Sequence, residues 1–283
     1  MRFAIKTAPQ HTDWKDMLDV WRGADEIDVF ESAWNFDHFY PIFSTDSHGP
    51  CLEGWSMLAA MAHATRRLRL GCLVTGIVYR HPAVMANMAA TVDVISDGRL
   101  ELGLGAGWNE EECQAYGIEL GTLRERFDRF DEAVEVIVSL LSKQTTTFDG
   151  KWFRLQDARC EPKPVQRPHP PIVIGGGGER RTLKTAARWA QHWNFPGGPI
   201  DVWKHKRDVL HGHCTAIGRD PAEITTSTHL RLSPEGDVGA LAEDAARWAE
   251  AGLDLGIVYL PPPHRASVLE PVAQALRPLV TVE

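Results

Sequence analysis

Short apolar runs and amphipathic stretches alternate along the whole chain. The runs FAIK, DVFESAW, LRLGCLVTGI and RLELGLGAG precede the helix-like segments TDWKDMLDVWRGADE, LEGWSMLAAMAHAT, PAVMANMAATVDVIS and a long stretch at about 124–141. The order continues with PIVIGG and its helix, HWNFP with a helix near 202–217, EITTSTHLRL with a helix near 238–251, and LGIVYL with a last helix. The pattern therefore predicts eight strand-then-helix units.

Eight such units in 283 residues predict a single α/β domain over 1–283, a closed (β/α)8 TIM-type barrel. A doubly wound open sheet is the competing fold, because it uses the same alternation. The segment 142–171 breaks the pattern, since its FDG turn predicts a hairpin and its prolines exclude a regular helix. We expect this irregular insertion to lie over the C-terminal mouth of the barrel.

Composition and charge narrow the class of protein. The chain is 43% hydrophobic and 24% charged, which is typical of a soluble globular protein, and its net charge of −8 without a basic block argues against nucleic acid as a partner. No apolar window is long enough to cross a membrane and no leader pattern is seen, so we expect a cytoplasmic protein. The five cysteines are widely spaced without a CxxC pair, which indicates reduced, mostly buried thiols.

In a barrel of this kind, functional groups belong at the C-terminal ends of the strands. The stretch WNFDHF places Asp37 and His38 after the second strand, and a carboxylate beside an imidazole suits proton transfer near neutral pH. A surface Asp-His turn is the simpler interpretation. After the third strand, Thr75 and Gly76 indicate a bulge that directs the backbone towards a ligand, although Gly76 could also provide only a tight turn.

Two glycine-rich stretches follow later strands. In LGLGAGWNEEE, the small residues of 103–107 allow a flat group to approach the mouth, and Asn109 can cap the next helix. Trp108 replaces the third glycine of a dinucleotide fingerprint, so that motif is not supported. Gly175–Gly178 precede a helix and favour a bound phosphate or carboxylate, whereas a turn for close helix packing is the alternative.

Taken together, these motifs resemble the luciferase-like flavin superfamily, and most of all its actinobacterial coenzyme F420-dependent oxidoreductase branch. The resemblance covers nearly the whole chain and is carried by WNFDHF, EGWSMLAAMAHATRRLRLGCLVTGIVYRHP, ATVDVISDGRLELGLGAGWNEEE, ERFDRFDEAVEVI and RPHPPIVIGGGGERRTL. It implies a TIM-like barrel with an insertion over its mouth, a deazaflavin at the C-terminal end, and a homodimer. The exposed apolar residues of LEGWSMLAAMAHA are a candidate interface.

The resemblance also assigns roles to individual residues. It implies that Asp37 contacts the cofactor, that His38 donates or accepts the proton beside the substrate, and that the peptide bond Leu73–Val74 is cis. The residues implied to bind the cofactor are Asp37, Leu73, Val74, Thr75, Ala106, Gly107, Asn109, Gly175, Gly176, Gly177 and Gly178.

One position departs from the family pattern. Sugar-phosphate dehydrogenases of the family carry a catalytic Glu where this chain has Trp108, so glucose 6-phosphate is not expected as substrate. Glu110 and Glu111 lie near this position and are expected to face solvent. An aromatic pocket would favour a small, partly apolar substrate; its expected members are Trp34, Phe39, Tyr40, Tyr79 and Trp108.

The function expected from these observations is hydride transfer between F420 and a small organic substrate. A reduced-FMN-dependent monooxygenase is the alternative, because both cofactors use similar ring and phosphate contacts. A metal-dependent barrel hydrolase is less favoured. It needs His and Asp ligands at the ends of several strands, which the sequence lacks, and His205, His211 and His213 do not share a helix face. A non-catalytic cofactor carrier is a further alternative.

Overall fold

The computed structural model describes residues 1–281, whose parallel strands form a ring. Within these residues one sheet has the order β3-β2-β1-β11-β10-β9-β8-β5-β4, and all its neighbours pair in parallel. The strands are β1 (Arg2–Thr7), β2 (Phe30–Asn35), β3 (Arg69–Cys72), β4 (Thr75–Gly76), β5 (Leu102–Gly105), β8 (Ile172–Gly175), β9 (His192–Phe195), β10 (Thr225–Arg231) and β11 (Leu255–Leu260).

The ring closes where β3 and β4 meet. These two strands are halves of one crossing, separated by Leu73 and Val74, and a parallel bridge joins Leu70 of β3 to Leu100 just before β5. The nine strands of this sheet in the described chain therefore occupy eight strand positions of the barrel, because β3 and β4 are two parts of one strand. The predicted (β/α)8 barrel is confirmed.

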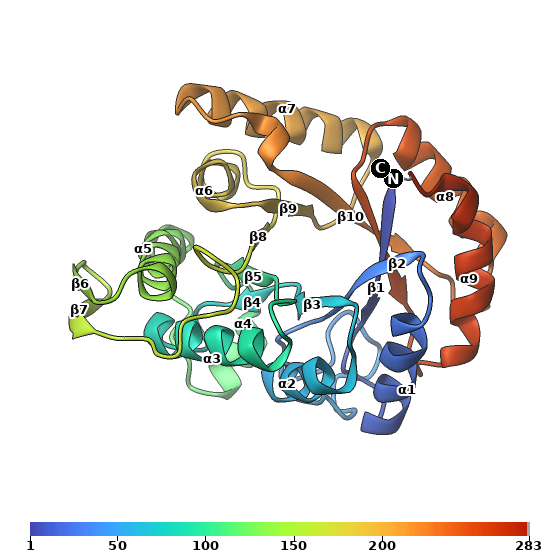
Figure 1. The fold of residues 1–283 in the computed structure, drawn as a ribbon, viewed down its shortest axis with the longest axis horizontal. Helices are drawn as coiled ribbons and strands as arrows, with labels where there is room; N and C mark the ends of the chain where they lie inside the picture. Colours follow the sequence, from blue (N-terminus) through green and yellow to red (C-terminus); the bar gives the residue numbers. More distant parts are fainter. Residues whose placement is uncertain (282–283) are drawn as a thin grey trace.

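Helices surround the strands on the outside, as Figure 1 shows. Polar side chains begin several of them: Asp13 caps α1, Glu53 caps α2, and Thr122 with Glu125 forms a capping box at α5. The helices are α1 (Trp14–Asp25), α2 (Gly54–Ala64), α3 (Pro82–Ile95), α4 (Glu110–Ala115), α5 (Leu123–Ser142), α6 (Thr182–Trp189), α7 (Ile200–Ala216), α8 (Val238–Glu250) and α9 (Leu269–Leu276), with short 3-10 turns at Pro221–Glu223, Ala266–Val268 and Arg277–Leu279.

The hydrophobic core has two layers. The larger one lies between the strands and the helices and includes the fully buried Trp21 and Trp203. The smaller one fills the barrel itself, where Trp34 packs with Leu73 and Val173. Aromatic side chains contribute large buried apolar areas, so both layers stabilise the barrel on which the mouth is built. No helix of the described chain combines the length and apolar character that a membrane crossing requires.

The irregular segment 142–171 contains the predicted hairpin, formed by β6 (Thr146–Asp149) and β7 (Arg154–Ala158). Glu132 of α5 accepts hydrogen bonds from the N–H groups of Lys151 and Trp152, at 2.9 and 2.8 Å. The hairpin therefore lies on the outer side of α5, at the edge of the molecule in Figure 1. We expected this segment over the mouth: Glu132 holds the hairpin turn against α5, while the Phe153 ring packs edge-on against His81 at the start of α3, so a position over the mouth stays a prediction.

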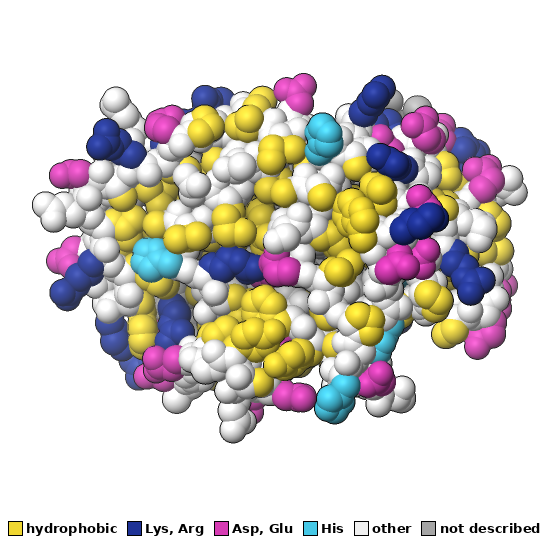
Figure 2. Space-filling model, turned by 90° about the horizontal axis from the view of Figure 1, so that it is seen from below, with side chains coloured by type: hydrophobic (Ala, Val, Ile, Leu, Met, Phe, Trp, Pro, Cys, Tyr) yellow, Lys and Arg dark blue, Asp and Glu magenta, His cyan; other side chains and the backbone are white. Residues whose placement is uncertain are grey.

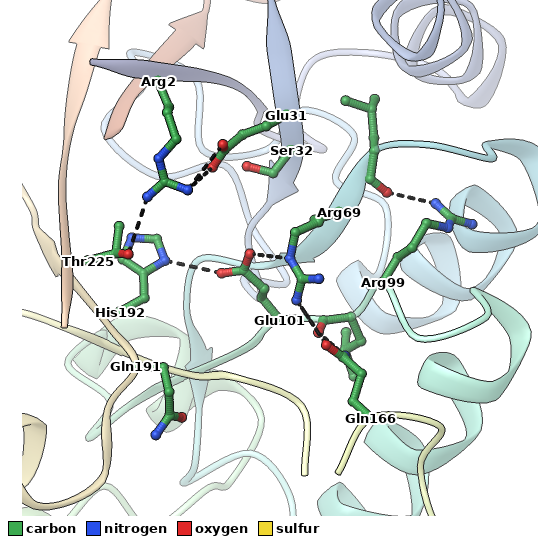
Figure 3. A network of polar contacts seen from close by, with 12 residues as sticks. Arg2, Glu31, Ser32, Arg69, Arg99, Glu101, Gln166, Gln191, His192 and Thr225 are labelled. Carbon is green, nitrogen blue, oxygen red and sulfur yellow. Dashed lines mark hydrogen bonds and ion pairs between the residues drawn. The ribbon is translucent and has the colours of Figure 1, made fainter. Parts of the chain in front are cut away.

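The proline-rich end of this segment reaches the opposite end of the barrel, where the strands begin. Gln166 donates to the Leu100 carbonyl at 2.7 Å and accepts from Arg69 at 3.1 Å. Figure 3 shows the network around it, in which Glu101 accepts from Arg69 at 2.7 Å and pairs with His192 at 3.2 Å. These contacts tie several strand starts together, which is the stabilising role usual for this end of a barrel.

Candidate functional site

The site is built at the C-terminal ends of the strands, beginning with His38 after β2. His38 is 9% exposed, and its Nδ1 lies 2.7 Å from Oε2 of Glu112 in α4. The Glu112 carboxylate also accepts from the Tyr79 hydroxyl at 2.9 Å and from the backbone N–H groups of Phe39 and Tyr40. Because Glu112 engages Nδ1, the ring leaves Nε2 for a substrate.

The electrostatics of this pair favour an ionised carboxylate. Burial raises the pKa of Glu112, but the hydrogen bonds from His38, Phe39 and Tyr40 outweigh burial and hold this pKa below its ordinary value. A carboxylate that stays ionised can stabilise a protonated imidazole. The pair is therefore suited to general acid–base chemistry.

Asp37 points to a different partner from its neighbour His38. Its Oδ2 accepts from Arg80 at 2.6 Å, and Arg80 also donates to Glu53 at 2.6 Å. Burial raises the pKa of Asp37 to about 7, although the nearby Arg80 lowers it. The second oxygen, Oδ1, is buried without a hydrogen-bond partner among residues 1–281. Such an oxygen is available to a ligand, because a buried polar atom left unpaired is costly.

The broken third strand forms the floor of the site. The peptide bond Leu73–Val74 is cis, as the family resemblance implies, and the next residue, Thr75, is buried and accepts from Trp55 at 2.9 Å. Glycines make room for the Val74 side chain: a Cβ at Gly105 would lie 2.7 Å from it, and a Cβ at Gly175 2.9 Å. These two glycines therefore contact the bulge directly, and not only a ligand.

The glycine loop after β8 presents free backbone donors. Gly176 has a φ of 120° and its N–H donates to Asn194, while the N–H groups of Gly177 and Gly178 find no acceptor within residues 1–281. Helix α6 follows, and its N-cap residue Arg181 provides no side-chain cap. Open amides at a helix N-terminus favour a phosphate or carboxylate. The anion-binding interpretation of this loop stays a prediction.

Helix α4 and the segment that precedes it position the acidic residue of the site, Glu112. Asn109 caps α4 by accepting from the Glu112 N–H at 3.3 Å, and Gly107 has a φ of 85°. Glu110 and Glu111 are exposed, as expected, whereas Glu112 is fully buried. Sequence reasoning missed Glu112, because three consecutive glutamates give no signal of which one the first turn of α4 directs inward.

Aromatic side chains form an outer wall above His38. Trp108, 49% exposed, meets the His38 ring edge-on with 5.3 Å between centroids, and the 88% exposed Phe43 stacks on Trp108 at 5.4 Å. Phe39 lies beside Tyr79, with 5.0 Å between the ring centroids. Trp34 was expected in this wall, but it is fully buried inside the barrel, because its β2 position points inward.

Two further charged residues at this end were also missed. Lys6 of β1 donates to the Leu73 carbonyl at 2.9 Å, and Arg80 pairs with Asp37. Next to Lys6 lies His229, which lines a hollow of about 530 Å³ between the loop after β9 and helix α8, together with Arg231. A lysine at an inward position of a buried strand is a signal that could have identified Lys6.

Metal-ligating side chains do not gather here. In the part of the chain that the structure describes, no group of three or more His, Cys, Asp or Glu has the geometry to hold a metal ion. His205 and His213, for example, contact the side chain and backbone of Glu179 on the outside of the barrel. All five cysteines are free, and four of them are buried.

The fold and the site together define a barrel whose mouth carries the buried His38–Glu112 pair. The chain belongs to the luciferase-like monooxygenase family, whose model matches residues 1–277. It is 32% identical over 248 residues to the F420-dependent glucose-6-phosphate dehydrogenase of Kineococcus radiotolerans, a match that covers 87% of this chain and 70% of that relative.

Two more comparisons agree with this placement. The F420-dependent hydroxymycolic acid dehydrogenase of Mycobacterium tuberculosis is 32% identical over 265 residues, covering 92% of this chain and 71% of that relative. Among solved structures, an F420-dependent secondary alcohol dehydrogenase in complex with an F420-acetone adduct superposes with a TM-score of 0.88 over 99% of both chains at 18% identity. At that identity the superposition supports the fold alone.

Proposed function

We propose that this protein is an F420-dependent oxidoreductase that transfers a hydride between the deazaflavin and a small organic substrate. The observation that carries the proposal is the buried His38–Glu112 pair, 2.7 Å apart, beside Asp37 and the Leu73–Val74 bulge. The names of the two relatives support F420 as the cofactor.

The residues present fit a cofactor of this kind. The unpartnered Oδ1 of Asp37 can accept from a polar ring or ribityl group, and the amides of Gly177 and Gly178 can hold a phosphate. Further residues proposed to line the cofactor are Leu73, Val74, Thr75, Ala106, Gly107, Asn109, Gly175 and Gly176. When bound, the deazaflavin supplies the carbon that accepts or donates the hydride.

The chain supplies the proton chemistry. His38 Nε2 takes the hydroxyl proton of an alcohol substrate, or gives one to a carbonyl oxygen in the reverse direction. Glu112 fixes the ring through Nδ1 and stabilises its charged form. The aromatic rings of Trp108 and Phe43 present apolar surface above His38, which favours a partly apolar substrate. We do not propose glucose 6-phosphate as the substrate, because this chain has Trp108 at the position where the family resemblance implies a catalytic Glu in sugar-phosphate dehydrogenases.

A reduced-FMN-dependent monooxygenase is the second candidate. The name of the matching family favours it, and the same ring and phosphate contacts would serve FMN. The two candidates differ in their need for oxygen, since a monooxygenase inserts an oxygen atom from O2 and hydride transfer does not.

We further propose a cytoplasmic homodimer. The apolar side chains of α2, expected to be exposed, are buried instead, with Trp55, Met57 and Leu58 in the core. Helix α3 instead carries exposed apolar residues, among them Val84 and Val94. Figure 2 shows apolar side chains gathered on the side of the molecule where α2 and α3 lie. We therefore place the candidate interface on α3; a purified protein that sediments as a monomer would contradict it.

The proposed function is tested by turnover without oxygen. The purified protein is incubated anaerobically with F420 and a panel of small alcohols, and with reduced F420 and the matching carbonyl compounds, while cofactor absorbance is followed. We expect F420 reduction or reoxidation with at least one apolar pair, and its loss in His38→Ala. Turnover that requires O2 and reduced FMN would instead support the monooxygenase.

A further inference from the structure

Lys6 is a buried charged group that the proposed acid–base chemistry does not use. It lies near the end of β1, where the strand register places it beside Trp34 of β2 and Tyr259 of β11. The side chain points into the barrel and is 5% exposed as a residue. Its Nζ donates to the Leu73 carbonyl at 2.9 Å and lies 3.4 Å from His229 Nε2. Lys6 therefore touches the bulge at the floor of the site from below.

No carboxylate compensates this lysine within residues 1–281. The charged or titratable groups that face it are His229 and Arg231 of β10, Tyr259 of β11 and Cys72 of β3. Burial, and then the charge of Arg231, lower the pKa of Lys6 to about 7. Buried cations in proteins are normally paired, so an unpaired one at a ligand site lacks a partner that a ligand can supply.

The hydrogen bonds of Lys6 leave room for such a partner. An ammonium group has three N–H donors, of which one is directed to Leu73 and a second can be accepted by a neutral His229. Burial and the neighbouring Lys6 and Arg231 hold the pKa of His229 well below its ordinary value, which agrees with a neutral ring. The hollow lined by His229 and Arg231 lies beside this cluster.

We propose that Lys6 is an electrostatic positioning residue of the cofactor site: a ligand bound on the Leu73–Val74 bulge brings negative charge to it, and binding is accompanied by uptake of a proton by Lys6. The inference rests on the proposed function, because the pyrimidine edge of a flavin-type ring is the group that would carry this charge. Because Lys6 also donates to the Leu73 carbonyl, it would link the charge of the bound ring to the position of the bulge.

The test is calorimetric titration of the purified protein with oxidised F420 at pH 8, repeated in two buffers of different ionisation enthalpy. The difference between buffers gives the number of protons taken up on binding. We expect wild type to take up about one proton more than Lys6→Met and Lys6→Gln, since an opposite charge raises the protonated fraction of a lysine. We also expect these variants to bind about tenfold more weakly.

The variants separate charge from hydrogen bonding. Lys6→Gln can still donate to the Leu73 carbonyl but carries no charge, whereas Lys6→Met does neither. Lys163→Met is the matched control, because the Lys163 ammonium donates to the Leu140 and Cys160 carbonyls away from the mouth. This control should bind with the proton uptake of wild type.

The outcomes distinguish failure of the inference from failure of the proposed function. If Lys6→Gln binds F420 with the affinity and proton uptake of wild type, Lys6 is only a structural donor and the inference is overturned, while the proposed function stands. If wild type binds neither F420 nor FMN, both fall together. A variant that unfolds is recognised by circular dichroism, and the remaining variant then decides.

Discussion

Two adjacent residues, Asp37 and His38, serve different parts of the site because the backbone after β2 turns them to different partners. Asp37 pairs with Arg80 beneath the mouth, while His38 pairs with Glu112 of α4. The ionised carboxylate of Glu112 is thus held beside the imidazole by three other donors and is not itself placed to meet a substrate. We therefore propose that Glu112 is a positioning residue for His38.

We expect His38→Ala to lower kcat by about 100-fold or more, and Glu112→Gln by about tenfold, with little change in KM. The reason is that, in the proposed function, Glu112 acts through the imidazole and His38 moves the proton itself. Steady-state kinetics measure both effects, and added imidazole should partly restore His38→Ala. The exposed Glu111→Gln is the matched control. Equal losses in Glu111→Gln and Glu112→Gln would contradict this assignment.

Lys6 makes stability depend on pH in a direction that can be worked out. Its pKa falls from 10.5 in the unfolded chain to about 7 in the fold, so the unfolded state binds more protons between these values. The free energy of unfolding should therefore rise as pH increases from about 7 to 10.5, and Lys6→Met should lack this rise. Urea unfolding at pH 7 and pH 10 measures it; parallel profiles for the two proteins would refute the prediction.

At the scale of the elements, apolar periodicity was sufficient to predict the barrel strands and the main helices. The helix expected at 124–141 spans Leu123–Ser142, and the one near 238–251 spans Val238–Glu250. The position of the insertion could not be predicted, because it depends on hydrogen bonds from its turn to Glu132, a residue distant in sequence. The inward direction of Glu112 depends in the same way on tertiary contacts.

The bulge between β3 and β4 depends on glycines in neighbouring strands. Gly105→Ala should destabilise the protein by about 1–3 kcal/mol, because the new Cβ would lie 2.7 Å from Val74. Gly212→Ala in the middle of α7 meets no atom within 4 Å and should stabilise by about 0.5–1 kcal/mol. Chemical denaturation compares the pair. Similar effects of both substitutions would show that Val74 does not fill the space beside Gly105.

At the scale of the whole molecule, the two ends of the barrel have different tasks. The strand starts carry the ion network of Figure 3, whose members are largely paired with one another. Among residues 1–281, the strand ends carry open amides, an Asp37 oxygen without a hydrogen-bond partner, and Lys6 without a carboxylate partner. Unsatisfied groups thus concentrate at the end where barrel enzymes bind their ligands.

This division predicts that the network affects stability without affecting the site. Hydrogen bonds and charges from His192 and Arg69 outweigh burial and lower the pKa of Glu101 to about 2. Its folded pKa is depressed, so its stabilisation is present above pH 4.5 and is lost as pH falls towards 2.

Glu101→Gln should therefore lower the free energy of unfolding by about 2–3 kcal/mol at pH 7, and by less near pH 3, with cofactor affinity unchanged. Acid and urea titrations measure this, with the more exposed Glu223→Gln as control. A loss of cofactor binding in Glu101→Gln at a pH where it is folded would contradict the separation of the two ends.

The central claim is that the mouth binds a deazaflavin for hydride transfer, and a parallel fluorescence titration with F420 and FMN, under matched salt and pH, tests it most directly. We expect tight binding of F420 and much weaker binding of FMN. Preference for FMN would contradict the claim and favour the monooxygenase. Binding of neither would show that the open amides of Gly177 and Gly178 do not hold the phosphate of either cofactor.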